Sequence, residues 1–347
     1  MLTTPLCRAL GVKHPIFSAG IGAAAGAELA AAVSNAGGCG VLGTASLPGK
    51  FVRAQIQRLK ELTAQPFGVN IVLPLLRNGQ LESCFDERIP ILVLFWGDPA
   101  PYVDEAHGRG MKVFLQVGSV EEAVAGAQAG VDAVIAQGFE AGGHVKGTTT
   151  IAVLLPAVVD AVGPIPVIAS GGIADGRGLV AALSLGAQGV SMGTRFLASA
   201  EANASTAYKE RVISAKAEDA IHLEHFDVGW SNAPHRVLRN ASVARWETAG
   251  RPPSGQRPGE RTVLGTMRSG GTTIDIPAYS PYLPESDVAA DVEQMALYAG
   301  QSCSLIDAVQ PAAEIVADMV RGASAAIDGL TAYREARSLH PSGSTSV

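Results

Sequence analysis

The chain has 347 residues, of which 47% are hydrophobic and 17% charged, so it can bury a large core. Its net charge of -6 argues against a protein that binds nucleic acid or a membrane surface, because both need a basic face. The chain start lacks the basic residues and long apolar core of a signal peptide, and no run reaches membrane-spanning length, so we expect a soluble cytoplasmic protein.

Short apolar runs, closed by glycines or polar residues, recur between residues 15 and 192. Such runs are typical of buried parallel strands. The expected strands are residues 15–19, 40–44, 67–73, 91–96, 112–117, 133–137, 166–169 and 189–192.

Segments with helical spacing of apolar residues separate these strands. Phe51, Ile56 and Leu59 share one face of residues 50–64, for example. The expected helices are residues 28–33, 50–64, 119–129, 150–162, 176–185 and 208–216, with a weaker pattern over 75–88. Eight strands alternating with helices predict an α/β fold of the (β/α)8 TIM-barrel type over residues 1–217, since doubly wound sheets usually have fewer strands.

Residues 218–339 have a different character, and we expect them to form a partly helical C-terminal appendage. Residues 251–259 are a loop by composition, and residues 272–284 show little periodicity. Two helices are expected at 288–299 and 308–326, followed by a disordered tail at 340–347. The appendage is expected to pack on the barrel and cover its mouth.

The loop after the sixth strand reads Gln137-Gly138-Phe139-Glu140-Ala141-Gly142-Gly143-His144. Ligands bind at the carboxyl ends of strands in α/β proteins. Gly142 and Gly143 carry no Cβ, so a flat ligand can lie against their backbone, and His144 titrates near neutrality. The loop therefore indicates a proton-transfer site beside a cofactor, although a glycine loop with a solvated histidine fits the motif alone equally well.

Two further loops favour a phosphate. Ser170-Gly171-Gly172 follows the seventh strand and Gly193-Thr194 follows the eighth. In a barrel these loops present backbone N–H groups to a phosphate, although the glycines can also simply turn the chain. A phosphate here and His144 one strand earlier fit a flat phosphorylated cofactor such as FMN.

Polar residues also stand near the ends of apolar strands. Asn70, Gln116 and Gln137 need partners if buried, and a flavin or substrate can supply them, as can other parts of the barrel. Other patterns are weaker. Gly20-x-Gly22-x-x-x-Gly26 lacks the acidic residue of a dinucleotide site and is better read as a tight turn over a ligand.

No metal site is expected. His222 and His225 have no evident third ligand, and an exposed helix is the expected setting for them. The four cysteines are far apart and include no Cys-x-x-Cys pair, which predicts free thiols in a reducing compartment.

The ordered motifs resemble the nitronate monooxygenase family, formerly called 2-nitropropane dioxygenases. The resemblance rests on segments 15–20, 31–38, 66–70, 137–144, 169–178 and 192–196, and covers about residues 5–215. It implies a TIM-like barrel with non-covalently bound FMN and His144 as the catalytic residue. The candidate cofactor-binding residues are Ala19, Gly20, Ile21, Asn70, Gln116, Gln137, Gly142, Gly143, Ser170, Gly171, Gly172, Gly193 and Thr194. Many relatives have a shorter link after the histidine than Val145-Lys146-Gly147, so the loop geometry and substrate fit can differ.

The resemblance implies oxidation of alkyl nitronates with O2 to carbonyl compounds and nitrite. NAD(P)H-dependent reductases of a quinone or an enoyl thioester, similar to enoyl-acyl-carrier-protein reductases, share the same motifs and stay an alternative. A third alternative is a barrel that binds a phosphorylated ligand without redox chemistry. The expected partners are small molecules, either a nitronate or NAD(P)H with an acceptor, together with a second copy in a homodimer.

Overall fold

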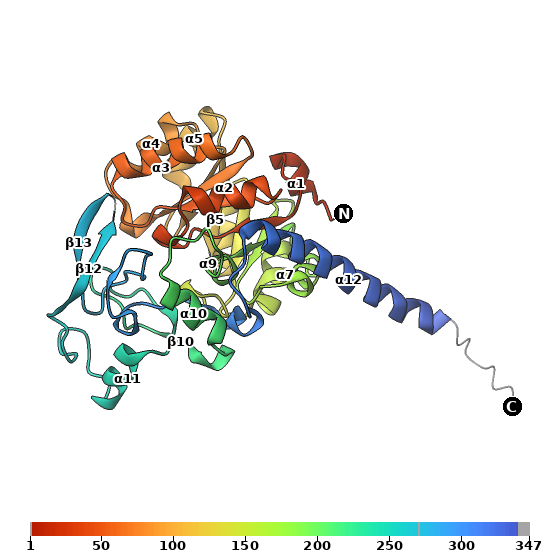
Figure 1. Cartoon of the computed structure of the whole chain (residues 1–347). Helices are drawn as coiled ribbons and strands as arrows, with labels where there is room; N and C mark the ends of the chain where they lie inside the picture. The colour runs from red at the N-terminus through yellow and green to blue at the C-terminus, as the bar shows by residue number, and fades with distance from the viewer. Residues whose placement is uncertain (1, 270, 339–347) are drawn as a thin grey trace, which may run out of the picture.

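The computed structural model describes residues 2–269 and 271–338, and eight parallel strands form its centre (Figure 1). They are β1 (Ile16–Ser18), β2 (Gly40–Gly43), β3 (Phe67–Val72), β4 (Ile91–Phe95), β5 (Lys112–Val117), β6 (Ala133–Gln137), β8 (Val167–Ser170) and β9 (Gly189–Met192). The sheet runs in the order β1-β9-β8-β6-β5-β4-β3-β2, and a parallel bridge between Phe17 and Cys39 joins its two edges. The predicted TIM barrel and its eight strands are confirmed.

Helices surround the barrel because each presents one apolar face to the sheet. They are α2 (Ala27–Asn35), α3 (Gly49–Leu62), α4 (Gln80–Asp86), α5 (Ala100–Gly108), α6 (Val120–Gln128), α7 (Ile151–Val162) and α8 (Gly176–Ser184). In α3, Val52, Ile56 and Leu59 are fully buried against the strands. Of the weaker pattern at 75–88 only α4 is an α-helix, because Gly79 before it is left-handed, with φ 84°. The sequence pattern did not predict α5.

The barrel interior is a packed core rather than a pore. Phe17, Phe114 and Ile135 belong to a buried cluster that also includes Leu6 and Cys7 of α1 (Pro5–Leu10). The hydroxyl of Thr4 caps α1 by accepting from the Cys7 N–H. Since α1 covers the amino ends of the strands, the carboxyl ends are left for ligands.

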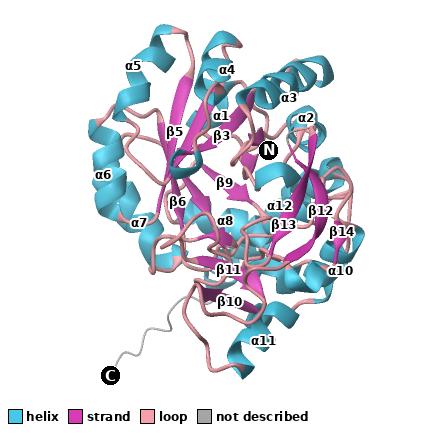
Figure 2. Cartoon of the chain, turned by 90° about the vertical axis from the view of Figure 1, so that its left-hand side faces the viewer, coloured by secondary structure: helices cyan, strands magenta, loops and turns pink. Residues whose placement is uncertain are grey.

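Residues beyond β9 build a roof over the carboxyl ends of the strands (Figure 2). Its helices are α9 (Thr194–Leu197), α10 (Thr206–Ser214) and α11 (Ala241–Thr248), and its strands are β10 (Ala220–Leu223), β11 (His235–Leu238), β12 (Val263–Ser269), β13 (Thr272–Pro277) and β14 (Ala289–Ala290). One sheet has the order β10-β11-β7, in which β7 (Gly143–His144) belongs to the loop after β6, and the other has the order β13-β12-β14. The roof therefore pairs directly with the loop that carries His144.

Two expectations for the roof were wrong. Residues 272–284 contain strand β13, which pairs along its length with β12. Residues 288–299 form β14 and a short 3-10 turn (Val292–Gln294) instead of a helix. The backbone carbonyl groups of Met295 and Tyr298 accept hydrogen bonds from the distant side chains of Asn240 and Tyr208, and Leu297 accepts from a backbone N–H on β11.

The last helix returns to the barrel wall. α12 (Ala312–Ser338) begins after Pro311, later than the predicted residue 308, and packs against α8 and α2. Contact is so close that a Cβ on Gly176 would lie 2.1 Å from the backbone nitrogen of Ala323. α12 therefore covers the outside of the barrel, and its far end projects beyond it (Figure 1). The boundary at residue 217 stays a prediction, and the tail at 340–347 lies outside the described residues.

All four cysteines are buried and unbridged. The helices in the described part of the chain include none with both the length and the apolar character that a membrane span requires.

Candidate active site

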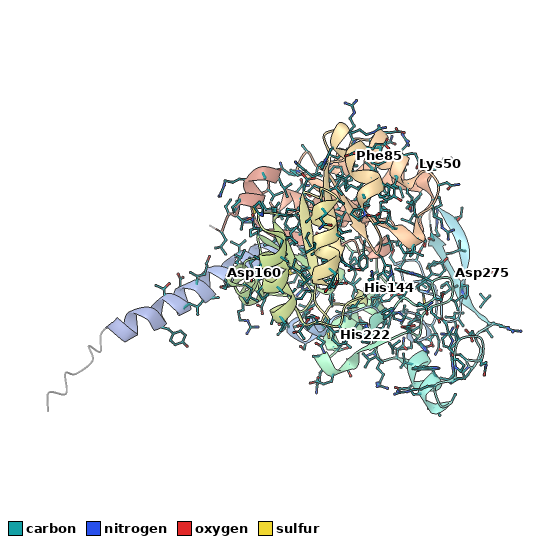
Figure 3. The ribbon with its side chains drawn as sticks, turned by 180° about the vertical axis from the view of Figure 1, so that it is seen from behind. Lys50, Phe85, His144, Asp160, His222 and Asp275 are labelled. Atoms are coloured by element: carbon teal, nitrogen blue, oxygen red, sulfur yellow. The ribbon has the colours of Figure 1, made fainter. Side chains whose placement is uncertain are left out.

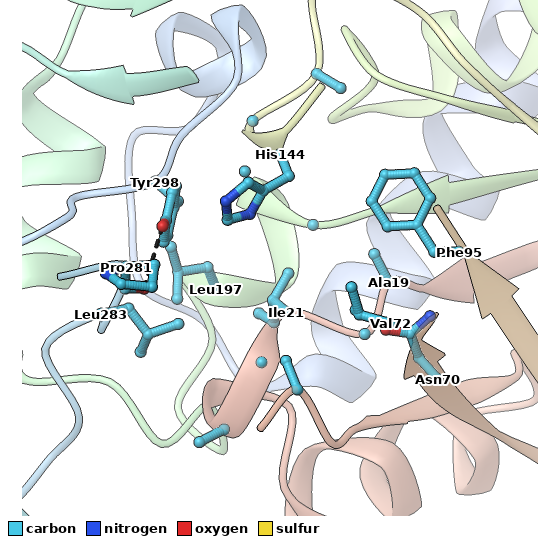
Figure 4. Close-up of a pocket in the computed structure, with 18 of the residues that line it drawn as sticks. Ala19, Ile21, Asn70, Val72, Phe95, His144, Leu197, Pro281, Leu283 and Tyr298 are labelled. Carbon is cyan, nitrogen blue, oxygen red and sulfur yellow. Dashed lines mark hydrogen bonds between the residues drawn. The ribbon is translucent and has the colours of Figure 1, made fainter. Parts of the chain in front are cut away.

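A cleft opens where the carboxyl ends of the barrel strands meet the roof (Figure 4). His144 and every residue predicted to bind the cofactor line this cleft. In Figure 4, His144 and Tyr298 approach the cleft from the side opposite Asn70 and Val72, with Ile21 between them. The structure thus brings together residues from six barrel strands or the loops that follow them.

The loops after β8 and β9 have a backbone suited to a phosphate. Gly171 and Gly172 are left-handed, with φ of 98° and 72°, a conformation that L side chains rarely adopt. A Cβ on Gly193 would come within 3.2 Å of Ile21 Cγ2, so glycine keeps the loop against the β1 segment. Because such loops expose consecutive backbone N–H groups without side chains in the way, they fit the phosphate of FMN.

The amides deeper in the cleft fit the polar edge of a flavin. Gln137 donates from Nε2 to the carbonyl of His144 at 3.0 Å, while its buried Oε1 has no partner among the described residues. Asn70 donates to the carbonyl of Val93 at 3.3 Å, and a Cβ on Gly20 would lie only 2.4 Å from Asn70 Cβ. Since a buried amide oxygen needs a donor, Gln137 is suited to receive an N–H from the cofactor.

The segment that carries His144 is held by the roof. β7 pairs antiparallel with β11, which sets His144 opposite His235 and Gly143 opposite Arg236. The Arg236 guanidinium donates to the carbonyls of Phe139, Ala141 and Ala220. His144 therefore lies on a fixed two-residue strand and not on the free loop that its sequence indicated.

His222 and His225 also belong to this region, and the expected exposed helix is wrong. His222 lies on β10, half-buried, with one ring nitrogen 3.3 Å from the Val145 carbonyl (Figure 3). His225 is fully buried beside Ser242. The described residues contain no group of three or more His, Cys, Asp or Glu side chains arranged to hold a metal.

Aromatic rings enclose the His144 imidazole. Trp230 stacks on it with ring centroids 4.1 Å apart, and Trp96, Tyr298 and His235 pack around it at 5.4 to 6.2 Å. Its buried Nε2 has no hydrogen-bond partner among the described residues. Loss of solvation, and secondarily the nearby His235, lower the pKa of His144 well below its usual value. The imidazole is therefore neutral at physiological pH and can accept a proton.

Sequence reasoning missed the roof side of the cleft. On the roof side, the lining residues with large or charged side chains are Leu197, Tyr208, Trp230, Met267, Tyr282, Leu283, Glu285 and Tyr298; Arg77 lines the cleft from the barrel segment before α4. No local motif marks the roof residues, since only the long-range packing of the roof brings them to the cleft. The sequence gives one weak signal for Trp230, namely that a large aromatic residue stands alone in the polar segment 229–232.

Replacing Trp230 with leucine is expected to let water reach His144. The pKa of His144 then rises toward its ordinary value. Because the activity needs the neutral imidazole, the acidic limb of the pH profile should shift to higher pH. The measurement is kcat/KM against pH. Trp246→Leu, on α11 away from the cleft, is the control and should leave the acidic limb of the profile unchanged. If Trp230→Leu and the wild type have the same acidic limb, the role given to Trp230 is contradicted.

Comparison with known proteins shows which family this chain belongs to. A family model described as nitronate monooxygenase matches residues 3–84 and 76–322. The (3aS,4S,5R,7aS)-5-hydroxy-7a-methyl-1-oxo-octahydro-1H-indene-4-carboxyl-CoA dehydrogenase of Mycobacterium tuberculosis is 38% identical over 253 residues, covering 72% of this chain and 70% of that protein. A probable nitronate monooxygenase of Staphylococcus saprophyticus is 35% identical over 270 residues, covering 63% of this chain and 75% of that protein.

The fold has a solved counterpart. The structure of FabK from Thermotoga maritima superposes with a TM-score of 0.78 at 32% identity, covering 96% of this chain and 100% of that chain. The likeness therefore includes the roof and α12 as well as the barrel.

Proposed function

The chain belongs to the nitronate monooxygenase family of FMN-dependent oxidoreductases, and from that premise we propose that it oxidises alkyl nitronates with O2 to carbonyl compounds and nitrite. The observation that carries the proposal is His144, a neutral imidazole in the cleft whose buried Nε2 has no hydrogen-bond partner within residues 2–269 and 271–338. A carbon acid needs such a base, placed where water is excluded.

Each group around the cleft has a part in this proposal. His144 takes the α-proton of a neutral nitroalkane at Nε2, or donates a hydrogen bond to the nitronate once protonated. The Gln137 amide holds the backbone of His144 in place, and Trp230 and Tyr298 keep water from the imidazole. FMN, when bound, supplies the redox chemistry between substrate and oxygen.

A second candidate is an NAD(P)H-dependent reductase of a quinone or an enoyl thioester. It is favoured by the likeness to a carboxyl-CoA dehydrogenase and to the enoyl reductase FabK, and by the apolar side chains of Met267 and Leu283 in the roof. The barrel without redox chemistry is set aside, because the family consists of oxidoreductases. The homodimer and the cytoplasmic location stay predictions.

Anaerobic mixing of the FMN-loaded protein with each electron donor tests the proposal. We expect an alkyl nitronate to bleach the flavin absorbance within the time of a single turnover, and NADH or NADPH to bleach it far more slowly. Rapid bleaching by NAD(P)H alone would contradict the proposal and support the reductase. The His144→Ala protein is mixed with the same donors as the matched control, and it shows which part of the bleaching depends on His144.

A further inference from the structure

Glu285 is a buried acidic side chain of the roof that faces the cleft and has no part in the chemistry above. It is 7% exposed, follows Pro281 and Leu283 of the cleft wall, and lines both the cleft and a smaller hollow beside it. A buried carboxylate ordinarily has a cationic partner. Among the described residues no basic side chain lies within ion-pair distance of Glu285.

One neighbour fixes the direction of this carboxyl group. Asn203 donates from Nδ2 to Glu285 Oε2 at 2.9 Å, and its Oδ1 accepts from the hydroxyl of Ser286. The same Nδ2 lies 3.5 Å from the carbonyl of Ala23, next to the segment after β1. Oε2 is therefore occupied, and Oε1 is the oxygen left for a ligand.

The charges around Glu285 are of both signs, and burial is the main reason why its neutral form is favoured. Glu28 and Asp287 line the adjoining hollow, together with Arg268 of β12. Burial raises the pKa of Glu285 to about 7, and the negative charge of the nearby Asp287 contributes to the rise. The hydrogen bond from Asn203 opposes the shift. Arg77 also lines the cleft, and His144 in the same cleft is neutral.

Two of the tyrosine hydroxyl groups in the cleft, those of Tyr208 and Tyr298, do not compete for this proton. Tyr298 donates to the Pro281 carbonyl and Tyr208 donates to the Tyr298 carbonyl, so both are already engaged. Burial raises the pKa of both phenols, which therefore stay neutral across the pH range in which Glu285 titrates.

We propose that protonated Glu285 donates a hydrogen bond from Oε1 to an anionic oxygen of the substrate, and so selects for the planar oxygen-bearing group of a nitronate. The identity of the anion rests on the proposed function. When Glu285 loses its proton, the donor disappears and two negative charges face each other. Anion binding therefore weakens as pH rises through the pKa of Glu285.

The first test measures binding without turnover. Nitrite, the anionic product of the proposed reaction, is titrated into the FMN-loaded protein, and the change in the flavin spectrum gives its Kd. Above pH 7 we expect the wild-type Kd to rise about tenfold per pH unit, which is the slope of a single required proton. In Glu285→Gln, which always keeps an amide donor, Kd should vary less than about threefold over the same range.

Asp287→Asn is the second variant, because removing its charge lowers the pKa of Glu285 and shifts the rise in Kd to lower pH. Infrared difference spectra of wild type against Glu285→Gln show directly whether a protonated carboxyl band is lost near pH 7. Parallel Kd profiles for wild type and Glu285→Gln, or the lack of that band, would overturn the inference. If both effects are found but nitronates are not oxidised, the proposed function fails while Glu285 still binds anions.

Discussion

Replacing His144 with alanine is expected to lower turnover of a neutral nitroalkane by about 10² to 10⁴-fold, the usual contribution of a positioned general base. The imidazole Nε2 is buried in the cleft and has no hydrogen-bond partner among the described residues, so it is free to act as the base there. FMN should stay bound, because the loops expected to hold its phosphate follow β8 and β9 and do not include His144. Turnover is measured as nitrite release and FMN content by absorbance.

The control is His107→Ala. His107 lies on α5, is exposed, and pairs with Asp132 on the outside of the barrel. It should leave turnover unchanged. A His144→Ala protein that retains full FMN and full activity would remove His144 from the mechanism, whereas one that loses FMN would show that the histidine holds the cofactor instead.

Replacing Arg257 with methionine is expected to destabilise the roof by about 3–5 kcal/mol, the range for breaking a buried ion pair by removing one partner. The Arg257 side chain is 2% exposed, contacts Asp227 at 2.7 Å and also pairs with Glu260. It donates to the His225 carbonyl and lies 4.4 Å over the Tyr279 ring. Without it, two carboxylates are left without a counter-charge.

The effect should reach the active site through the turn that carries Trp230. The backbone N–H of Trp230 donates to the backbone carbonyl of Asp227 at 2.9 Å, and the Trp230 ring in turn stacks on His144. Chemical denaturation measures the stability, and the acidic limb of kcat/KM reports on His144. Arg177→Ala removes an exposed pair with Asp175 and should lower the stability far less than Arg257→Met does, because solvent screens the pair. Equal losses for Arg257→Met and Arg177→Ala would contradict the role of the buried cluster.

The same cluster gives the roof a pH dependence. Burial opposes the shift, but hydrogen bonds from Arg257 and from backbone N–H groups lower the pKa of Glu260 to about 2. Its stabilising contribution is thus present above the ordinary value near 4.5 and is lost as pH falls toward 2. In Arg257→Met this acid-dependent loss of stability should be smaller than in wild type.

The barrel was predictable from sequence because its signals are local. Parallel strands buried on both faces are continuous apolar runs, and β5, β6 and β9 have the bounds that these runs predicted. The glycine loops after β6, β8 and β9 are also recognisable from the sequence, since each directly follows such a run. α5 gave too weak a signal, with only Val103 and Ala106 of its residues buried.

The roof could not be predicted because distant partners determine it. Residues 143–144 pair with residues 235–236, and the carbonyl of Met295 accepts from Asn240. These bonds replace the local ones that the apolar residues at 288–299 indicated for a helix. For the same reason Trp230 and Glu285 have no sequence motif, and their place beside the cleft depends on the assembled roof.

The most direct test of the account is a crystal structure of the FMN-loaded protein. We expect the isoalloxazine in the cleft between Ile21 and His144, its polar edge at Asn70 and Gln137, and its phosphate at Gly171, Gly172 and Thr194. Electron density for FMN outside this cleft, or with its phosphate remote from the loops after β8 and β9, would contradict it.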